Sequence, residues 1–133
     1  MTHATVHQVF AATAARTPQA EGLFTESVTA AAYGIAAGAI YWGDAAAEID
    51  RLRAAYAQAG YGHGHRVGLL LENRPAFILH WLALNALGAS VVPINGEMRS
   101  AELVYLIGHS EIGLAVTLPE RTADLQAPAA QAR

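Results

Sequence analysis

The sequence contains no cysteine. This absence excludes disulfide bonds, thiol catalysis and cysteine metal ligands, and it is compatible with the reducing cytoplasm, where we expect the protein to reside. Charged residues are also scarce, at 14% of the chain, and the formal net charge is −3. The eight basic residues are scattered and form no stripe, so we predict no binding to nucleic acid.

Signals for export and membrane insertion are missing as well. The first ten residues lack the basic region and the long apolar run of a signal peptide. Residues 75–96 include no charged side chain, but Pro93 within them would interrupt a membrane-spanning helix. A buried helix followed by a buried strand explains this stretch better.

Motifs for phosphate and metal binding are also absent from the sequence. No strand–GxxxxGK[ST]–helix loop occurs, and Gly60, Gly62 and Gly64 precede a predicted strand, whereas the glycines of a dinucleotide fingerprint follow one. His63 and His65 alternate and would supply two ligands to a metal, but no third ligand is nearby. We interpret this stretch as a solvated loop.

Hydrophobic residues make up 53% of the chain, well above the content of a disordered chain. In the second half we expect strands at 66–71, 90–94 and 113–118, a helix at 76–87, and a helix that Ser100 caps and that ends near His109. The short links between these elements indicate parallel βαβ units, and apolar runs without alternation indicate strands covered on both faces. The sequence therefore predicts an α/β fold.

The first half of the chain has weaker patterns. It predicts a helix at 4–16, strands at 22–28 and 39–42, and a further helix that starts at Gly43 and Asp44 and ends near Gly60. The alanine- and glycine-rich residues 29–38 are expected to form a loop or a hairpin. Residues 119–133 are expected to form a frayed helix or a disordered tail.

The predicted helix 76–87 is apolar around almost its whole circumference, which is typical of a helix inside a large protein. We therefore interpret the chain as part of something larger. His80 and Asn85 are nearly the only polar side chains on this helix, and they could line a pocket. Because buried polar groups are normally paired, we favour a neighbouring backbone group or a partner surface as their partner. Glu97 and Glu102 lie near a helix N-terminus, where acids are favourable anyway.

The order of these motifs resembles the N-terminal region of the AMP-forming acyl-CoA synthetases, a family of adenylate-forming ligases. The match runs over about residues 5–118, and it is most similar to crotonobetaine- and fatty-acyl-type ligases. His65, Gly96 and Ala45 stand where the family commonly has Asp, Pro and Leu, and none of these positions is catalytic in the family. The matching motifs, in chain order, are Arg16–Thr17–Pro18, Tyr41–Trp42–Gly43–Asp44, Gly64–His65–Arg66–Val67, Asn73–Arg74–Pro75, Gly88–Ala89–Ser90–Val91–Val92–Pro93–Ile94–Asn95 and Glu102–Leu103.

The resemblance implies that residues 1–118 are an incomplete N-terminal AMP-binding domain, built from parallel βαβ units. The parent enzyme would activate a carboxylate with ATP as an acyl-adenylate, release pyrophosphate, and transfer the acyl group to coenzyme A. Magnesium would neutralise the phosphate charge. The remainder of the parent chain would be the partner of this one.

The resemblance also implies that this chain is inactive on its own. The family's Ser/Thr/Gly-rich phosphate loop ending in Pro-Lys-Gly, its adenine motif, its ribose-binding Asp and its C-terminal adenylation lysine do not occur here. We therefore expect no catalytic, metal-binding or cofactor-binding residue in the chain. Arg99 is one weak candidate for contact with the coenzyme A nucleotide, and the alternative is a solvated arginine in the first turn of a helix.

Two other interpretations remain open. A stand-alone flavodoxin-like α/β module would bind a small ligand beyond its strand ends, near Glu72, Asn73, Asn95 and Gly96. A dimeric or domain-swapped scaffold without a ligand would instead use the apolar helix. A loop with Pro-Lys-Gly downstream of Arg133 would decide in favour of the enzyme.

The apolar helix 76–87 predicts self-association of the isolated chain. Exposed apolar patches drive association, so we expect a dimer or a larger oligomer at micromolar concentration. Light scattering over a wide range of concentrations measures the mass. A monomer of 14.0 kDa throughout that range would contradict the interpretation of the chain as part of a larger domain.

Overall fold

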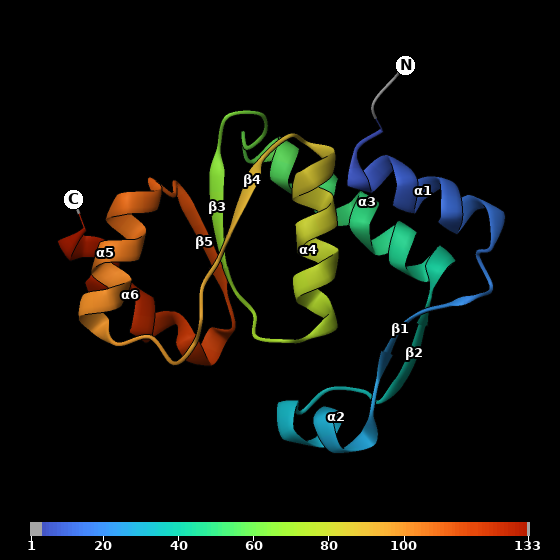
Figure 1. Ribbon diagram of the computed structural model, residues 1–133, viewed down its shortest axis with the longest axis horizontal. Helices are drawn as coiled ribbons and strands as arrows, with labels where there is room; N and C mark the ends of the chain where they lie inside the picture. The colour runs from blue at the N-terminus through green and yellow to red at the C-terminus, as the bar shows by residue number, and fades with distance from the viewer. Residues whose placement is uncertain (1–3, 133) are drawn as a thin grey trace.

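The computed structural model describes residues 4–132. Its elements in chain order are α1 (Val6–Arg16), β1 (Glu21–Thr25), α2 (Ser27–Tyr33), β2 (Gly38–Tyr41), α3 (Trp42–Gln58), β3 (Arg66–Leu70), α4 (Pro75–Ala86), β4 (Ser90–Pro93), α5 (Ser100–Ser110), β5 (Leu114–Thr117), the 3-10 helix η1 (Pro119–Arg121) and α6 (Thr122–Gln131). Figure 1 shows three layers, with a sheet between two groups of helices. Helix α4 lies on one face of the sheet, with α3 and α1 behind it, and α5 and α6 lie on the other face.

The central sheet has the strand order β4-β3-β5, and both pairs of strands are parallel. Val67 of β3 is opposite Val91 of β4 and Leu114 of β5. Strand β3 is buried at every position after Arg66, because helices cover both of its faces. The three parallel strands predicted from the sequence are confirmed, and α4 lies between the first two of them, as expected.

The two crossovers of this sheet run in opposite directions. Helix α4 connects β3 to its neighbour β4, and α5 connects β4 to β5 on the far side of β3. Because crossovers between parallel strands are right-handed, this reversal puts α4 and α5 on opposite faces, as Figure 1 shows. The carboxyl ends of the three strands meet at one edge, where open α/β sheets bind ligands.

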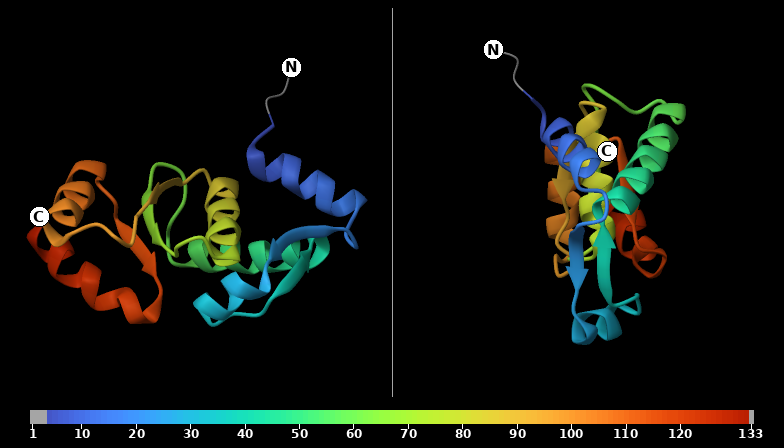
Figure 2. Two further views of the ribbon diagram at one scale, coloured as in Figure 1. Left: turned by 60° about the horizontal axis from the view of Figure 1, so that its bottom comes forward. Right: turned by 90° about the vertical axis from the view of Figure 1, so that its right-hand side faces the viewer.

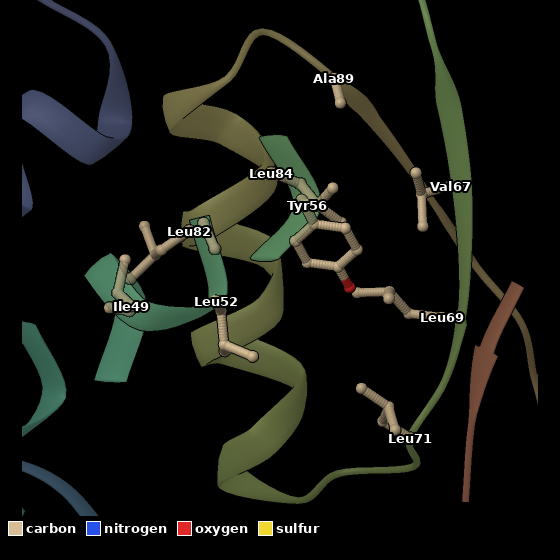
Figure 3. Packing of buried hydrophobic residues seen from close by; sticks show 10 residues of the cluster. Ile49, Leu52, Tyr56, Val67, Leu69, Leu71, Leu82, Leu84 and Ala89 are labelled. Carbon is tan, nitrogen blue, oxygen red and sulfur yellow. The ribbon is translucent and has the colours of Figure 1, made fainter. Parts of the chain in front are cut away.

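Helix α4 is covered by the chain itself. Leu82, Ala83 and Leu84 are buried, and every other residue of α4 is at least partly buried. Tyr56 and Leu52 of α3 pack in the same cluster (Figure 3). The expectation of an exposed apolar helix is therefore wrong, since the sheet, α3 and α1 enclose it.

Large apolar side chains are exposed elsewhere. Phe24 is 66% exposed, Val28 82% and Tyr105 69%. Phe24 and Val28 belong to the β1–α2–β2 segment, which projects from the layers (Figure 2). Self-association stays a prediction, with this segment and α5 in place of α4 as the apolar surface. None of the helices that the structure describes is long and apolar enough to cross a membrane.

Residues 27–33 form helix α2, although the sequence analysis expected a loop or a hairpin there. Alanine favours the helix, and Gly34 ends it in a left-handed conformation with φ of 67°. Strand β1 therefore ends at Thr25, earlier than predicted, and it pairs with β2 in an antiparallel ladder.

Residues 119–131 form η1 and α6, where the sequence analysis expected a frayed helix or a disordered tail. Leu125 and Pro128 of α6 are buried, and Leu125 packs with Leu70, Ile94 and Leu103 on the second face of the sheet. The sequence of α6 has little apolar periodicity, because these two side chains are the ones that the helix buries. The last residue of the chain lies outside the described part.

Leu84 offers a test of the core. Its side chain is 0% exposed, so truncation leaves a cavity. We expect Leu84→Ala to lower the free energy of unfolding by about 2–5 kcal/mol in urea denaturation followed by circular dichroism. Val28→Ala is the matched control, because Val28 is 82% exposed and its truncation should change that free energy by less than about 0.5 kcal/mol. Equal effects of the two substitutions would contradict the described core.

Candidate functional site

A groove of about 550 Å³ lies at the carboxyl edge of the sheet. Glu72 and Asn73, which follow β3, line it together with Asn95 and Gly96, which follow β4. The structure thus brings together the four residues at which the sequence predicted a ligand site for a stand-alone module. The other lining residues are Tyr33, Phe77, Pro93, Ile94, Glu97 and Arg121.

Arg121 reaches the groove from η1, beyond the end of β5. Its Nη2 donates to the carbonyl oxygen of Gly96 at 2.5 Å, and its Nε donates to Asp124 Oδ2 at 2.5 Å. A Cβ at position 96 would lie 2.7 Å from Arg121 Nη1, so glycine gives the guanidinium room to approach the backbone. The sequence analysis missed Arg121, because no motif links it to a residue 25 positions earlier in the chain.

Arg74 links three separate segments at the same edge. Its Nη1 donates to the carbonyl oxygen of Tyr33 at 2.8 Å, and its guanidinium carbon lies 4.7 Å from the centre of the Tyr33 ring. Its Nη2 is 3.6 Å from Glu72 Oε1 and 3.7 Å from Glu120 Oε1. The side chain is only 12% exposed, so water screens these contacts less than it screens a surface ion pair. In the sequence, Arg74 stood out only as part of a helix-start motif.

Glu72 has a left-handed backbone conformation, with φ of 56°. A non-glycine residue adopts this conformation at a cost of about 1–2 kcal/mol. It turns the chain sharply between β3 and α4, and the ion pair of Glu72 with Arg74 is one contact that holds the turn.

The groove combines apolar side chains with hydrogen-bonding groups. Glu72 and Glu97 contribute carboxylates, Asn73 and Asn95 contribute amides, and Phe77 is among the apolar residues. The residues that line it include no nucleophile paired with a base. The groove is therefore suited to binding a small polar molecule, and its two carboxylates disfavour a polyanion.

His80 and Asn85 of α4 are both paired within the fold, Asn85 with a backbone group, as the sequence analysis favoured, and His80 with a side chain. The Nδ1 atom of His80 lies 2.7 Å from the hydroxyl oxygen of Tyr56. The Oδ1 atom of Asn85 accepts a hydrogen bond from the backbone N–H of His7 at 2.9 Å, which ties α1 to α4. Both side chains therefore join helices to one another, and neither lines the groove.

His63 and His65 belong to the loop before β3. The Nδ1 atom of His65 accepts a hydrogen bond from the backbone N–H of Gly62 at 3.0 Å, and its ring packs edge-on against Tyr61. Both histidines are exposed, as expected of a solvated loop. Within residues 4–132, no three His, Asp or Glu side chains lie close enough together to hold a metal ion.

Arg99 is the N-cap residue of α5 and not part of its first turn. Its backbone N–H donates to Glu102 Oε2 at 2.7 Å, so Glu102 stabilises the start of the helix. Ser100, which the sequence predicted as the cap, is the first helical residue. Arg99 is exposed and does not line the groove, whereas Glu97 does.

Comparison with known families adds to this geometry. The family described as AMP-binding enzyme matches residues 10–133 of this chain. Crotonobetaine/carnitine–CoA ligases of Salmonella typhimurium and Salmonella enteritidis are 37% identical to it over 70 residues, or 53% of this chain. The chain covers 14% of the length of these relatives.

Solved structures show the same fold. The N-terminal domain of FACL13 from Mycobacterium tuberculosis superimposes with a TM-score of 0.83 at 20% identity, over 98% of this chain and 31% of that one. A long-chain-fatty-acid CoA ligase from Rhodopseudomonas palustris gives a TM-score of 0.78 at 21% identity, over 96% of this chain and 30% of that one. The α/β arrangement with a parallel sheet is thus that of the N-terminal domains of adenylate-forming enzymes, as predicted.

The Tyr56–His80 pair predicts a pH dependence of stability. Burial lowers the pKa of His80 below its ordinary value of 6.5, an effect that Arg51 increases and Glu48 opposes. Burial raises the pKa of Tyr56 to about 12, so its hydroxyl stays protonated at neutral pH. As the pH falls, His80 is protonated more readily in the unfolded chain than in the folded chain, because its pKa is lower in the folded chain. The free energy of unfolding is therefore highest above pH 6.5 and falls as the pH drops through that value.

We expect this loss to begin about one pH unit above the unfolded-state pKa and to continue below it, in urea denaturation of the unsubstituted chain. His80→Gln retains a polar partner for Tyr56 but cannot take up the proton, so it should flatten the dependence. His63→Gln, which changes an exposed histidine, is the matched control and should leave the slope unchanged. Identical slopes in His80→Gln and the unsubstituted chain would show that His80 is not the responsible group.

Proposed function

Because this chain belongs to the AMP-binding enzyme family, we propose that it is the N-terminal portion of an ATP-dependent acyl-CoA synthetase. The observation that carries the proposal is the family match, which extends over residues 10–133. In this role the chain, as a partial AMP-binding domain, supports further segments of the parent enzyme that pack against it.

In the parent enzyme, a carboxylate would react with ATP to give an acyl-adenylate and pyrophosphate, and the thiol of coenzyme A would then take the acyl group. The crotonobetaine/carnitine–CoA ligases among the relatives support a carboxylic acid as the substrate and coenzyme A as the acceptor. ATP, magnesium and coenzyme A would be required by the parent. The absence of cysteine fits a cytoplasmic enzyme, and the fatty-acyl ligases that share the fold support a role in fatty acid metabolism.

The described residues do not fit a magnesium-bound triphosphate. Such a group needs cationic side chains or a backbone cradle directed at its oxygens. The two arginines at the carboxyl edge, Arg74 and Arg121, already contact Glu72, Glu120 and Asp124. The chain's contribution would thus be structural support without a catalytic group. Arg99, exposed at the start of α5, is the one candidate for a contact with coenzyme A.

The groove at the carboxyl edge favours a second candidate function, a flavodoxin-like module that binds a small ligand on its own. In that case Asn73 and Asn95 would bind a polar molecule directly, and no further segment would be needed to complete the site. This candidate differs from the first in requiring no ATP.

The isolated chain should neither bind Mg-ATP tightly nor catalyse pyrophosphate exchange, because it has no phosphate loop and the two arginines at the carboxyl edge of the sheet contact carboxylates. Calorimetric titration with Mg-ATP measures the first property. A pyrophosphate exchange assay with acids from acetate to long-chain fatty acids measures the second, with a complete acyl-CoA synthetase as the positive control. Micromolar ATP binding that persists at high salt, or exchange above background, would overturn the supporting role.

A further inference from the structure

The β1–α2–β2 segment, residues 21–41, projects from the three layers (Figure 2). Tyr33, the last residue of α2, forms part of the wall of the carboxyl-edge groove. A second hollow of about 360 Å³ lies between this segment and the start of α4, and it is lined by Phe24 and Thr29 on one side and Ile78 on the other. Two hollows therefore separate α2 from the body of the fold.

Arg74 bridges this separation. Its hydrogen bond to the carbonyl oxygen of Tyr33, at 2.8 Å, is the one hydrogen bond within residues 4–132 that joins α2 to the fold outside the segment. The Tyr33 ring also lies against the guanidinium, 4.7 Å from its carbon atom. Besides the burial of Ala30 and the pairing of β1 with β2, the Arg74 side chain is therefore what fixes α2 next to the groove.

The contact of Arg74 with its partners is incomplete. The nearest oxygens of Glu72 and Glu120 are 3.6 Å and 3.7 Å from its Nη2, beyond hydrogen-bond distance. Its Nε is buried without a hydrogen-bond partner among the described residues. A guanidinium has five N–H donors, and a well-fixed one satisfies most of them. The bond to the Tyr33 carbonyl oxygen is thus the one direct hydrogen bond that this guanidinium makes among the described residues.

The base of the segment is fixed while its outer part is compliant. A Cβ on Gly22 would lie 2.6 Å from the Trp42 ring, so the backbone of β1 packs tightly on α3 at this point. The ladder shifts register between Glu21 and Leu23, and such bulges bend a strand locally. Beyond the bulge the segment continues as an isolated two-stranded ladder, which is only marginally stable by itself.

We propose that α2 and the ladder beyond the bulge form a hinged flap over the carboxyl-edge groove, and that Arg74 holds this flap closed. Release of Tyr33 from Arg74 lets α2 move away as a folded helix and widens the groove. Re-engagement brings Tyr33 back to the groove wall. The inference goes beyond the proposed function and holds for the chain alone as well as within a parent enzyme.

Spin-label distances in the full chain test this flap. Because the sequence has no cysteine, labels attach only at introduced cysteines. A first pair of labels, at Ala32→Cys and Ala101→Cys, measures the distance between α2 and α5. A second pair, at Arg53→Cys and Ala101→Cys, measures the distance between α3 and α5, which the flap should not change. All three positions are exposed. Double electron–electron resonance should give one narrow distance distribution for each pair. With Arg74→Ala, a second population at longer distance should appear for the first pair only.

Arg66→Ala is the matched control, because it removes an exposed arginine that pairs with Glu111 at 2.9 Å, away from the flap, and it should change neither distribution. Tyr33→Ala removes the ring and keeps the backbone contact, so it should give a smaller second population than Arg74→Ala. The Cα chemical shifts of residues 27–33 should stay helical in both flap variants. An unchanged first distribution, a change in both distributions, or loss of the helical shifts would each overturn the hinged flap. If Arg74→Ala fails to fold, Tyr33→Ala decides by the same criteria.

Discussion

Burial of strand β3 from both sides is the constraint on which the rest of the structure depends. Val67 and Leu69 face the cluster formed with α3 and α4, whereas Leu70 faces the cluster formed with α5 and α6. Gly68 leaves so little room that a Cβ there would lie 2.9 Å from Ile94 Cδ1. Each face needs its own helical cover, and the crossovers supply it by running in opposite directions. Because the strands are parallel, the turns after them lie at one edge, and the reversal opens a groove there between the two crossovers.

Features carried by adjacent residues were predictable from the sequence, and features made by distant residues were not. The apolar run of residues 66–71, followed by Pro75 as a helix start, identified the central βαβ unit without any knowledge of its neighbours. The contact of Arg121 with Gly96 has no local signal, because Gly96 follows β4 whereas Arg121 lies in η1, beyond β5 and 25 positions later in the chain. Helix α2 was missed, and α6 was expected only as a frayed helix or a disordered tail, for another reason: each has few buried side chains, so neither has a strong apolar period. The four turn residues of the groove were predictable, since strand ends converge in any parallel sheet.

This chain belongs to a nucleotide-binding family, yet its carboxyl edge has little free positive charge for binding a nucleotide. The contacts of the two arginines at that edge explain why. Arg121 donates to Asp124 and to the carbonyl oxygen of Gly96, whereas Arg74 donates to the carbonyl oxygen of Tyr33 and lies 3.6 Å from Glu72. Their positive charge therefore joins the turn after β3, the turn after β4, α2 and η1 to one another. Membership of a nucleotide-binding family is therefore compatible with a segment whose arginines hold parts of the fold together.

The central position of β3 also determines the order in which its two strand pairings can form during folding. Its pairing with β4 closes across one short crossover, whereas its pairing with β5 must await the second crossover and closes a longer loop at a higher entropic cost. A chain that leaves the ribosome from its N-terminus can therefore cover the α4 side of β3 early, while Leu70 on the opposite side waits for α5, β5 and α6. We expect nascent chains to pass through a half-covered intermediate, with the later face of the sheet as the surface that chaperones bind.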